Sequence, residues 1–460
     1  MNRLSLAHLP VAPAVDPRSL SVGVVHLGLG AFHRAHQAVV TERAAALTGD
    51  TRWGISGVSQ RSATVREQLQ PQDGLYAVLE RGSGDPAVQV LGSIREVLTA
   101  PEDPEAVVAR IADPEVSVVT LTVTEKGYRA RGSGLDLDDP EIQADLTGRP
   151  PRTVVGQLAA ALARRESPLT VVSCDNLVAN GPFLRRLVAE YFEALGKVPD
   201  VFEASRFPAS MVDRIVPATT DADRDEAARL LGVRDEAVVV AEPFLQWVIE
   251  EDFAGARPAW EQGGAVLTTD VAPWERAKLR ILNATHSMLA YLGALRGYET
   301  IAAAVRDEEL ARSARALITD DVIPTLTPPD GLDLASYGET VLERFANPAL
   351  KHRTAQVAMD GSVKLPVRLL GTVEDRLAAG AEPTTLALAV AGWMVYVDST
   401  LSLDDPQAAV LTAALDGAET PAAVVDSLLS VGSVFSSTLQ NSQRFRDLLV
   451  DHVTALRSKS

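Results

Sequence analysis

The sequence has a single cysteine, Cys174, and no apolar run as long as the ~18 residues of a membrane-spanning helix. One cysteine cannot form a disulfide bond within the chain, and no cysteine and histidine cluster has the spacing of a structural zinc site. The N-terminus lacks the sustained apolar stretch of a secretory signal. These absences predict a cytoplasmic protein that does not enter a membrane.

Positive charge is also scarce. The 460 residues carry 43 Lys and Arg against 61 Asp and Glu, a formal net charge of −18. This balance argues against nucleic acids and anionic membranes as partners, because both bind basic patches. A small molecule remains as the expected partner, and a monomer is compatible with such a surface.

Lysine is rare even among the basic residues. Arginine keeps its proton in proteins, whereas a buried lysine can titrate near neutral pH. A lysine retained in this arginine-rich chain is therefore a candidate for chemistry. The six are Lys126, Lys197, Lys278, Lys351, Lys364 and Lys459.

What is present is enough apolar sequence, 46% of residues, to form large cores. In the first half, residues 22–27 predict a strand that ends at Gly28, and residues 38–47 predict a helix. A strand, a glycine turn and a helix open a dinucleotide-binding unit. Further strands are expected at 54–59, 75–80, 88–94, 116–122 and 169–173, and helices at 154–165 and 182–195. We therefore predict an α/β fold with a Rossmann-type domain whose mostly parallel sheet is covered on both faces.

The second half of the sequence predicts helices almost throughout and no alternating strands. Helices are predicted at 274–295, 299–318, 338–346, 384–400, 405–415, 420–430 and 440–457. The change falls within residues 262–272. We expect a Rossmann dinucleotide-binding domain over residues 1–268 and a mainly helical substrate and catalytic domain over 269–460.

The glycine turn after the first strand is the first candidate site. Two glycines would let the backbone approach a pyrophosphate, and the following helix offers free N–H groups. The candidate cofactor-binding residues are Gly28, Gly30, Ala31 and Phe32. A tight turn without a ligand is the alternative.

His33 replaces the third glycine of the usual pattern. His33 and His36 could both face a metal, but no third ligand is evident, and packing or capping is the expected role of the two histidines.

The residues after the second strand bear on the choice of cofactor. NAD-binding folds usually place an acidic residue there to hold the ribose hydroxyls. This chain has Ser59-Gln60-Arg61-Ser62 instead. Arg61 could meet a 2′-phosphate or be a solvated loop residue, so NAD is expected as the cofactor and NADP stays possible.

Polar clusters follow two later strands, at residues 122–128 and 173–181, where ligands of open α/β sheets bind. Ordinary turn chemistry is the alternative. Farther on, Glu275, Lys278, Asn283 and His286 could line one side of a helix. A polar stripe beside so apolar a segment would need partners. Residues 344–368 are also dense in polar groups and could hold hydroxyls or a carboxylate.

Taken together, seven motifs in order resemble the polyol-specific long-chain dehydrogenase family, which includes mannitol 2-dehydrogenase, arabinitol dehydrogenase and fructuronate reductase. They are GLGAFHRAHQ, TEKGY, SCDNLVANG, MVDRIVP, EPFLQWVIE, KLRILNATHS and NPALKHRTAQVAMDGSVKLP, between residues 22 and 368. The resemblance implies a Rossmann domain, a helical domain and a metal-independent reaction.

The resemblance also implies roles for individual residues. Lys278 would be the general acid and base, Asn176 and Asn283 the amides that hold the reacting oxygen, and His286 a substrate-orienting residue. Asp213, Glu275, Lys364 and Arg353 would belong to the substrate site and proton path, and Glu125 to the cofactor site.

The implied reaction interconverts a secondary alcohol of a polyol or aldonate with its ketose, of the mannitol and fructose type. Gln356 stands where some mannitol-oxidising members carry arginine. The surrounding motif is closer to members that act on keto-uronates. Fructuronate reduction and mannitol 1-phosphate oxidation are therefore alternatives.

Two alternatives lie outside the family. Glu125, Glu242 and Glu275 could supply a carboxylate pair for glycoside hydrolysis, although such an enzyme needs no glycine turn. A non-catalytic, nucleotide-sensing Rossmann protein is the other. The lysine, asparagine and histidine of the helix at 275–286 argue against it.

Overall fold

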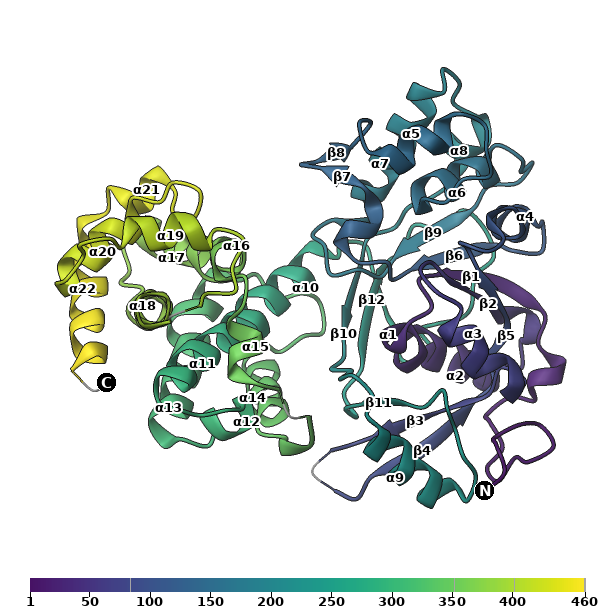
Figure 1. Cartoon of the computed structure of the whole chain (residues 1–460), viewed down its shortest axis with the longest axis horizontal. Coiled ribbons are helices and arrows are strands. Elements are labelled where there is room, and N and C mark those ends of the chain that lie inside the picture. Colours follow the sequence, from purple (N-terminus) through teal and green to yellow (C-terminus); the bar gives the residue numbers. More distant parts are fainter. Residues whose placement is uncertain (83, 351, 401, 459–460) are drawn as a thin grey trace. The chain divides into compact units, whose positions relative to one another are not determined.

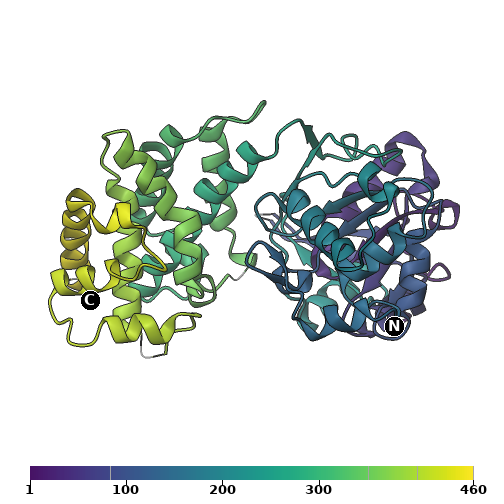
Figure 2. The same ribbon diagram turned by 90° about the horizontal axis from the view of Figure 1, so that it is seen from above.

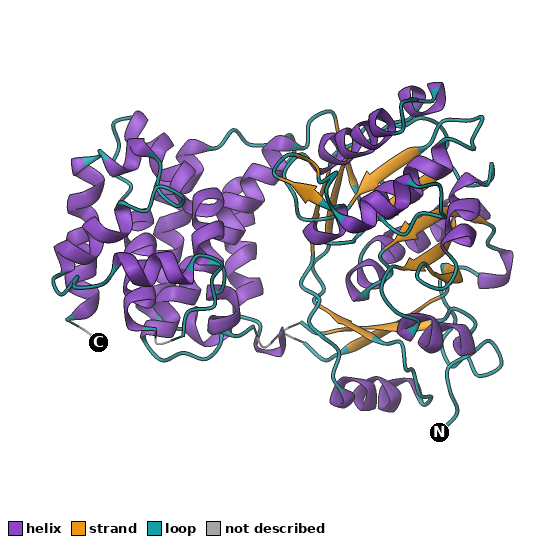
Figure 3. Ribbon diagram, turned by 45° about the horizontal axis from the view of Figure 1, so that its top comes forward, coloured by secondary structure: helices purple, strands orange, loops and turns teal. Residues whose placement is uncertain are grey.

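The computed structural model describes residues 1–82, 84–350, 352–400 and 402–458. The chain divides into two compact units, Met1–Ala272 and Pro273–Ser460. Strands lie in the first unit, and the described part of the second is helical (Figure 3). No helix within the described ranges combines the length and apolar character needed to cross a lipid bilayer.

The first unit is built on a five-stranded parallel sheet with the order β5-β2-β1-β6-β9 (Figure 1). Its strands are β1 Val22–Leu27, β2 Gly54–Ser59, β5 Ile94–Thr99, β6 Val118–Leu121 and β9 Thr170–Ser173. The chain order reverses between β1 and β6, as in dinucleotide-binding folds. The prediction of a Rossmann-type parallel sheet is confirmed.

Side chains alternate between the two faces of this sheet along each strand, and other elements cover both faces. Val25 and Leu27 pack in one core with α4 (Pro104–Ala112), α6 (Val154–Leu162) and α7 (Asn180–Ala194). Val24 packs on the opposite side with α2 (Gln37–Thr48) and with strand β12 (Gln246–Glu250). For this reason the run VGVVHL is apolar except at His26.

Smaller sheets complete the first unit. They have the orders β11-β3-β4, β10-β12-β13 and β7-β8. Their strands are β3 Tyr76–Glu80, β4 Ala87–Leu91, β7 Ala130–Arg131, β8 Gly134–Leu135, β10 Ser210–Asp213, β11 Val239–Ala241, β12 Gln246–Glu250 and β13 Val266–Thr268. The remaining helices are α1 Ala31–Ala35, α3 Thr64–Leu69, α5 Pro140–Leu146, α8 Asp200–Ala204 and α9 Asp221–Leu231.

The strand predicted over 88–94 is confirmed up to Leu91, but its end is wrong. The structure ends β4 at Leu91 and begins β5 at Ile94. Between them, the backbone N–H groups of Gly92 and Ser93 donate to the Glu42 carboxylate at 2.8 and 2.9 Å. A buried side chain from α2 thus takes two donors that a continuous strand would use, and the chain passes from one sheet to the other.

The second unit packs its helices around α18 (Thr384–Ser399), which contacts α11 (Ala284–Leu295) and α22 (Gln443–Arg457) (Figure 2). Helix α18 is apolar on nearly all sides, as a buried helix should be. The other helices are α10 Ala272–Ala277, α12 Ile301–Ala304, α13 Glu308–Ala316, α14 Leu334–Phe345, α15 Thr354–Ala358, α16 Gly361–Leu365, α17 Gly371–Ala378, α19 Ala408–Ala414, α20 Pro421–Leu429 and α21 Ser437–Gln440.

The helix predicted over 274–295 is not uniform. Between α10 and α11 the segment Lys278–Asn283 is π-helical. Similar π-helical turns occupy Leu317–Val322 and Pro366–Leu370. Such turns are rare in proteins and are frequent at functional sites.

Candidate active site

The turn after β1 fits a dinucleotide. Gly28 has a φ of +96°, and a Cβ there would lie 2.1 Å from the carbonyl oxygen of Thr122, so the turn requires glycine. A Cβ on Gly30 would meet only the Gly28 carbonyl oxygen, at 3.7 Å. The first glycine is therefore fixed by the neighbouring strand β6, and the second leaves an open face that a pyrophosphate would need. Ala31 and Phe32 begin α1 directly after it.

His33 fills the place of the missing third glycine. Its ring stacks on His26 of β1, with ring centroids 3.4 Å apart. The His26 ring nitrogens contact the hydroxyls of Thr120 and Thr122 at 2.8 and 2.9 Å. Burial lowers the pKa of His26 to about 3 and that of His33 well below its usual value, so both are neutral at pH 7. An imidazole thus packs α1 against the sheet.

The metal alternative for His33 and His36 gains no support. His36 Nε2 lies 2.9 Å from the carbonyl oxygen of Gln246, and the His33 ring is buried against His26. In the described ranges, no group of three or more His, Cys, Asp or Glu side chains could hold a metal ion.

A pocket of about 400 Å³ lies where β2, β5 and β6 end. Gln60 and Arg61 line it from the loop after β2, and Lys126 from the loop after β6. Glu125, predicted to bind the cofactor, is exposed at the start of that second loop and is not among the lining residues.

The polar loops after β6 and β9 are joined by Asp175. Its carboxylate accepts hydrogen bonds from the backbone of Val123 and Thr124, at 3.0 and 2.8 Å, and from the Tyr128 hydroxyl at 2.6 Å. Burial raises the pKa of the Asp175 carboxyl. The structure therefore brings together the two motifs that the sequence singled out, and it does so through a residue that was not assigned a role.

Asn176, the next residue, is exposed at the carboxyl end of β9. Asp213 ends β10 and is 5% exposed. Another asparagine, Asn180, is 1% exposed, and its amide donates to the carbonyl oxygens of Asp175 and Ser210 at 3.0 and 2.8 Å. That amide fixes the loop that carries Asn176.

Lys278, the predicted general acid and base, lies on the π-helical turn Lys278–Asn283 of the second unit. Lys278, Asn283 and Glu275 are 9%, 7% and 8% exposed. In an α-helix, residues five apart point roughly 140° from one another. The wider turn of a π-helix reduces that angle. The π turn thus brings Lys278 and Asn283 nearer to one face than a regular α-helix would.

His286 follows on α11. Its ring stacks on Phe345 and on His352, with centroids 4.7 and 5.5 Å away, and its buried Nε2 has no hydrogen-bond partner within the described ranges. Burial, then His352 and the cations Arg368, Lys364 and Arg344, hold the pKa of His286 well below its usual value. A neutral ring with a free nitrogen can exchange a hydrogen bond with a hydroxyl group.

Three cations therefore contribute to lowering the pKa of His286. Arg344 is 7% exposed on α14. Arg368 Nη1 donates to the Ser287 hydroxyl at 3.0 Å, and burial lowers the pKa of its guanidinium. Lys364 Nζ donates to the Met359 carbonyl oxygen at 2.6 Å and lies 3.7 Å from the Asp360 carboxylate. We refer to Arg344, Lys364 and Arg368 as the His286 cation cluster.

The cluster was only partly predicted. Lys364 had been assigned to the substrate site, whereas Arg344 and Arg368 had not. The signal that could have found them is the density of basic residues between 344 and 368.

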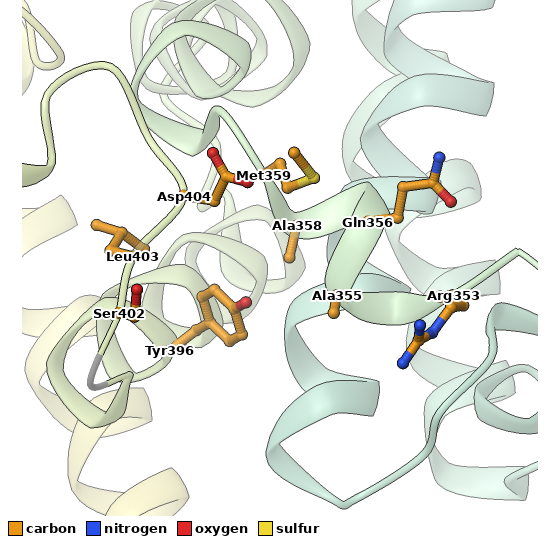
Figure 4. A pocket seen from close by; sticks show the side chains of 9 residues that line it. All are labelled: Arg353, Ala355, Gln356, Ala358, Met359, Tyr396, Ser402, Leu403 and Asp404. Atoms are coloured by element: carbon orange, nitrogen blue, oxygen red, sulfur yellow. The ribbon is translucent and has the colours of Figure 1, made fainter.

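Arg353 lies apart from this cluster in the described contacts. It is exposed at the N-cap of α15 and lines a second pocket of about 440 Å³ (Figure 4). Gln356 of α15 lines the same pocket. Asp404, on the loop after α18, lies across the pocket from it (Figure 4).

Comparisons with known proteins cover nearly the whole chain. The profile of the mannitol dehydrogenase Rossmann domain matches residues 22–262, and that of the mannitol dehydrogenase C-terminal domain matches residues 270–457. The D-mannonate oxidoreductase of Escherichia coli (strain K12) is 42% identical over 97% of this chain and 95% of its own.

Two solved structures are similar throughout. A substrate-free D-sorbitol dehydrogenase is 32% identical with a TM-score of 0.92, covering 100% of this chain and 99% of its own. The Pseudomonas fluorescens mannitol 2-dehydrogenase, in a ternary complex with NAD and D-mannitol, is 34% identical with a TM-score of 0.84, covering 100% and 97%. The resemblance drawn from the motifs is confirmed, and neither the hydrolase nor the nucleotide-sensor alternative is supported: the chain belongs to the mannitol dehydrogenase family of oxidoreductases.

Proposed function

We propose that this oxidoreductase interconverts the secondary alcohol of an aldonate with the ketone of a keto-uronate, using a nicotinamide dinucleotide. The observation that carries the proposal is the His286 cation cluster. Buried positive charge is costly unless an anion compensates it. Lys364 already has the Asp360 carboxylate 3.7 Å away, so the argument rests on Arg368, whose hydrogen-bond partner is the neutral Ser287 hydroxyl. A substrate carboxylate would supply an anion for it, and arginine is suited to binding a carboxylate with two hydrogen bonds.

The similarity to a D-mannonate oxidoreductase supports the same substrate class, because mannonate is an aldonate. Gln356, in the place where mannitol-oxidising relatives can carry arginine, agrees with a substrate that differs from mannitol.

Lys278 is assigned as the general acid and base. Removing the hydroxyl proton of an alcohol requires a neutral amine, and a free lysine has a pKa of ~10.4, so about 4 kcal/mol must be supplied for the amine to be neutral near pH 7. Burial favours the neutral form of an amine, and Lys278 is 9% exposed. When bound, the nicotinamide accepts or supplies the hydride.

Asn176 and Asn283 are assigned as the amide donors to the reacting oxygen. A neutral amide stabilises a developing alkoxide without adding charge, with a contribution of about 3 kcal/mol per donor. His286 would hold a substrate hydroxyl through its free Nε2. Asp213 and Glu275 would belong to the substrate site and the proton path.

A panel of carbonyl substrates tests the proposal. Absorbance at 340 nm would be followed with the reduced dinucleotide and fructuronate, fructose or fructose 6-phosphate. We expect kcat/KM for fructuronate to exceed that for fructose by about a hundredfold or more, as expected when buried charged groups lose their partner. Equal values for fructuronate and fructose would contradict the assignment of a carboxylate.

Two neighbouring substrate classes remain as candidates. The mannitol complex of the Pseudomonas fluorescens enzyme favours a neutral polyol. The His286 cation cluster would also suit a phosphate, as in mannitol 1-phosphate. The same panel distinguishes them, since fructose or fructose 6-phosphate would then give the highest kcat/KM.

For the cofactor, we propose a nicotinamide adenine dinucleotide, NAD or its 2′-phosphorylated form NADP. The glycine turn at Gly28 and Gly30 fits a pyrophosphate, and the related mannitol 2-dehydrogenase structure contains NAD.

A further inference from the structure

The pocket at the carboxyl ends of β2, β5 and β6 is basic, although the chain is strongly acidic. Four of its lining residues carry positive charge: Arg61, Lys126, Arg129 and Arg152. Glu141 is the acidic residue among those that line it. Arg129 forms one ion pair with Glu141 and a second, at 3.4 Å, with Asp139. The charge of Glu141 is therefore already compensated by Arg129.

The other three cations have no such partner. Arg61, Lys126 and Arg152 form no ion pair and no side-chain hydrogen bond with any residue in the described part of the chain. Elsewhere in the first unit arginines are commonly paired, as Arg66 is with Glu102 and Arg110 is with Glu96. Three unpaired positive charges around one pocket therefore indicate that its ligand is an anion.

The segments that carry these cations are held in place by one side chain. Gln157 of α6 is 0% exposed. Its Oε1 accepts from Gln60 Nε2 at 3.0 Å, and its Nε2 donates to the Arg152 carbonyl oxygen at 3.2 Å. The loop after β2 and the turn before α6 are thus tied to each other, which fixes the backbone that carries the exposed side chains of Arg61 and Arg152.

The turn before α6 has further support. The Asp145 carboxylate accepts from the backbone N–H groups of Arg152 and Thr153, both at 2.9 Å. Thr153 caps α6, and Thr153 and Val154 line the pocket, so the positive end of this helix adds to its field.

The position of the pocket indicates which anion it takes. In a dinucleotide-binding fold the adenosine ribose lies beside the residues that follow the second strand. An acidic residue there holds the free 2′-hydroxyl of NAD and repels a 2′-phosphate, whereas an arginine accommodates the phosphate. Here Arg61 occupies that place, and the sequence Ser59-Gln60-Arg61-Ser62 has no acidic residue.

We infer that Arg61, Arg152 and Lys126 form a site for the 2′-phosphate of a dinucleotide, so that the chain binds NADP(H) in preference to NAD(H). The inference rests on the proposed function, from which it takes the presence of a dinucleotide, and it is independent of the sugar substrate.

Equilibrium binding tests it without turnover. NADPH and NADH would be titrated into the full chain and followed by nicotinamide fluorescence, and 2′-AMP and 5′-AMP would compete with the bound nucleotide. We expect a dissociation constant about tenfold or more lower for NADPH than for NADH, because a phosphate gains charge-assisted hydrogen bonds. We also expect 2′-AMP to compete better than 5′-AMP.

Variants locate the effect. R61A and R152A should each weaken NADPH binding about tenfold and change NADH binding less than about twofold. R61D should reverse the preference. R149A is the matched control, since Arg149 is an exposed arginine in the same loop that does not line the pocket. Thermal unfolding of each variant would verify that it folds.

The outcomes separate the two proposals. Binding of NADH as tight as that of NADPH, unchanged in R61A and R152A, overturns the 2′-phosphate site and leaves the proposed function standing. Failure of both dinucleotides to bind overturns both proposals. Preference for NADPH without turnover of fructuronate supports this site and removes the proposed substrate.

Discussion

Arg368 Nη1 donates a hydrogen bond to the Ser287 hydroxyl at 3.0 Å, which places a guanidinium one residue along α11 from His286. The bond holds the arginine beside an imidazole whose Nε2 has no partner among the described residues. The hydroxyl is neutral, so it does not compensate the charge. Arg368 therefore keeps its capacity to bind an anion.

The first prediction follows from that capacity. R368M should raise the KM for fructuronate about tenfold or more, because a charge-assisted hydrogen bond contributes about 1.5–3 kcal/mol. The KM for fructose should change little. S287A is the matched control, since it removes the tie to Arg368 and keeps the charge. A similar loss with both sugars would mean that Arg368 supports the fold and does not recognise a carboxylate.

The second prediction concerns Lys278. K278A should lower kcat at least a thousandfold, about 4 kcal/mol, because no other group would take the proton. Dinucleotide affinity, measured by fluorescence titration, should be nearly unchanged. K197A, which removes an exposed lysine of the other unit, is the control.

The role of Lys278 also predicts how the rates of oxidation and reduction change with pH. The neutral amine is the base, so alcohol oxidation should accelerate as the pH rises, whereas ketone reduction needs the protonated amine and should slow. A K278A variant that retains a tenth of the wild-type activity at every pH would rule out the assigned role.

The sequence predicted the parts of the fold whose signal is local. The strands β1, β2, β6 and β9 are short apolar runs with clear ends, and β2 was predicted over its observed range, Gly54–Ser59. The junction between β4 and β5 could not be predicted in this way. It depends on Glu42, about 50 residues away in sequence, which captures the N–H groups of Gly92 and Ser93.

The candidate site shows the same division. Lys278 and Asn283 could be selected by residue type, but the π turn that brings them nearer to one face has no distinct signature in KLRILN. The His286 cation cluster comes from α14, α16 and a π-helical turn, so no single helical stripe shows it. The stack of His33 on His26 likewise depends on how α1 packs against β1.

The third prediction separates two glycines of one turn. G28A should destabilise the protein by several kcal/mol, because the residue has a φ of +96° and its Cβ would lie 2.1 Å from the Thr122 carbonyl oxygen. G30A has room for its Cβ and should cost at most about 1 kcal/mol. Urea unfolding would measure both.

The added methyl group of G30A should nevertheless lower dinucleotide affinity about tenfold or more, because it occupies the face that the pyrophosphate approaches. Wild-type affinity in G30A would contradict the placement of the dinucleotide at this turn.

The last prediction concerns acid stability. His26 and His33 are neutral in the folded protein, where burial lowers the pKa of His26 to about 3 and that of His33 well below its usual value. In the unfolded chain both titrate near pH 6.5. Above that pH the two imidazoles are neutral in both the folded and the unfolded state, so they do not lower the free energy of unfolding. Below it the unfolded chain alone takes up the protons, so stability falls by about 1.4 kcal/mol per pH unit for each imidazole.

The H33F variant tests this directly. Both His33 ring nitrogens are buried without a hydrogen bond of good geometry in the described part of the chain, and Gln37 is the polar side chain that acts on the ring. A phenyl ring would keep the stack on His26 and lose only this contact with Gln37. Between pH 7 and pH 5, urea unfolding of H33F should lose about 2 kcal/mol less stability than the wild type. Measurements at pH 7 and pH 8 are the control, because neither state gains a proton from these groups over that range. Equal losses in both proteins between pH 7 and pH 5 would show that His33 is protonated while the protein remains folded.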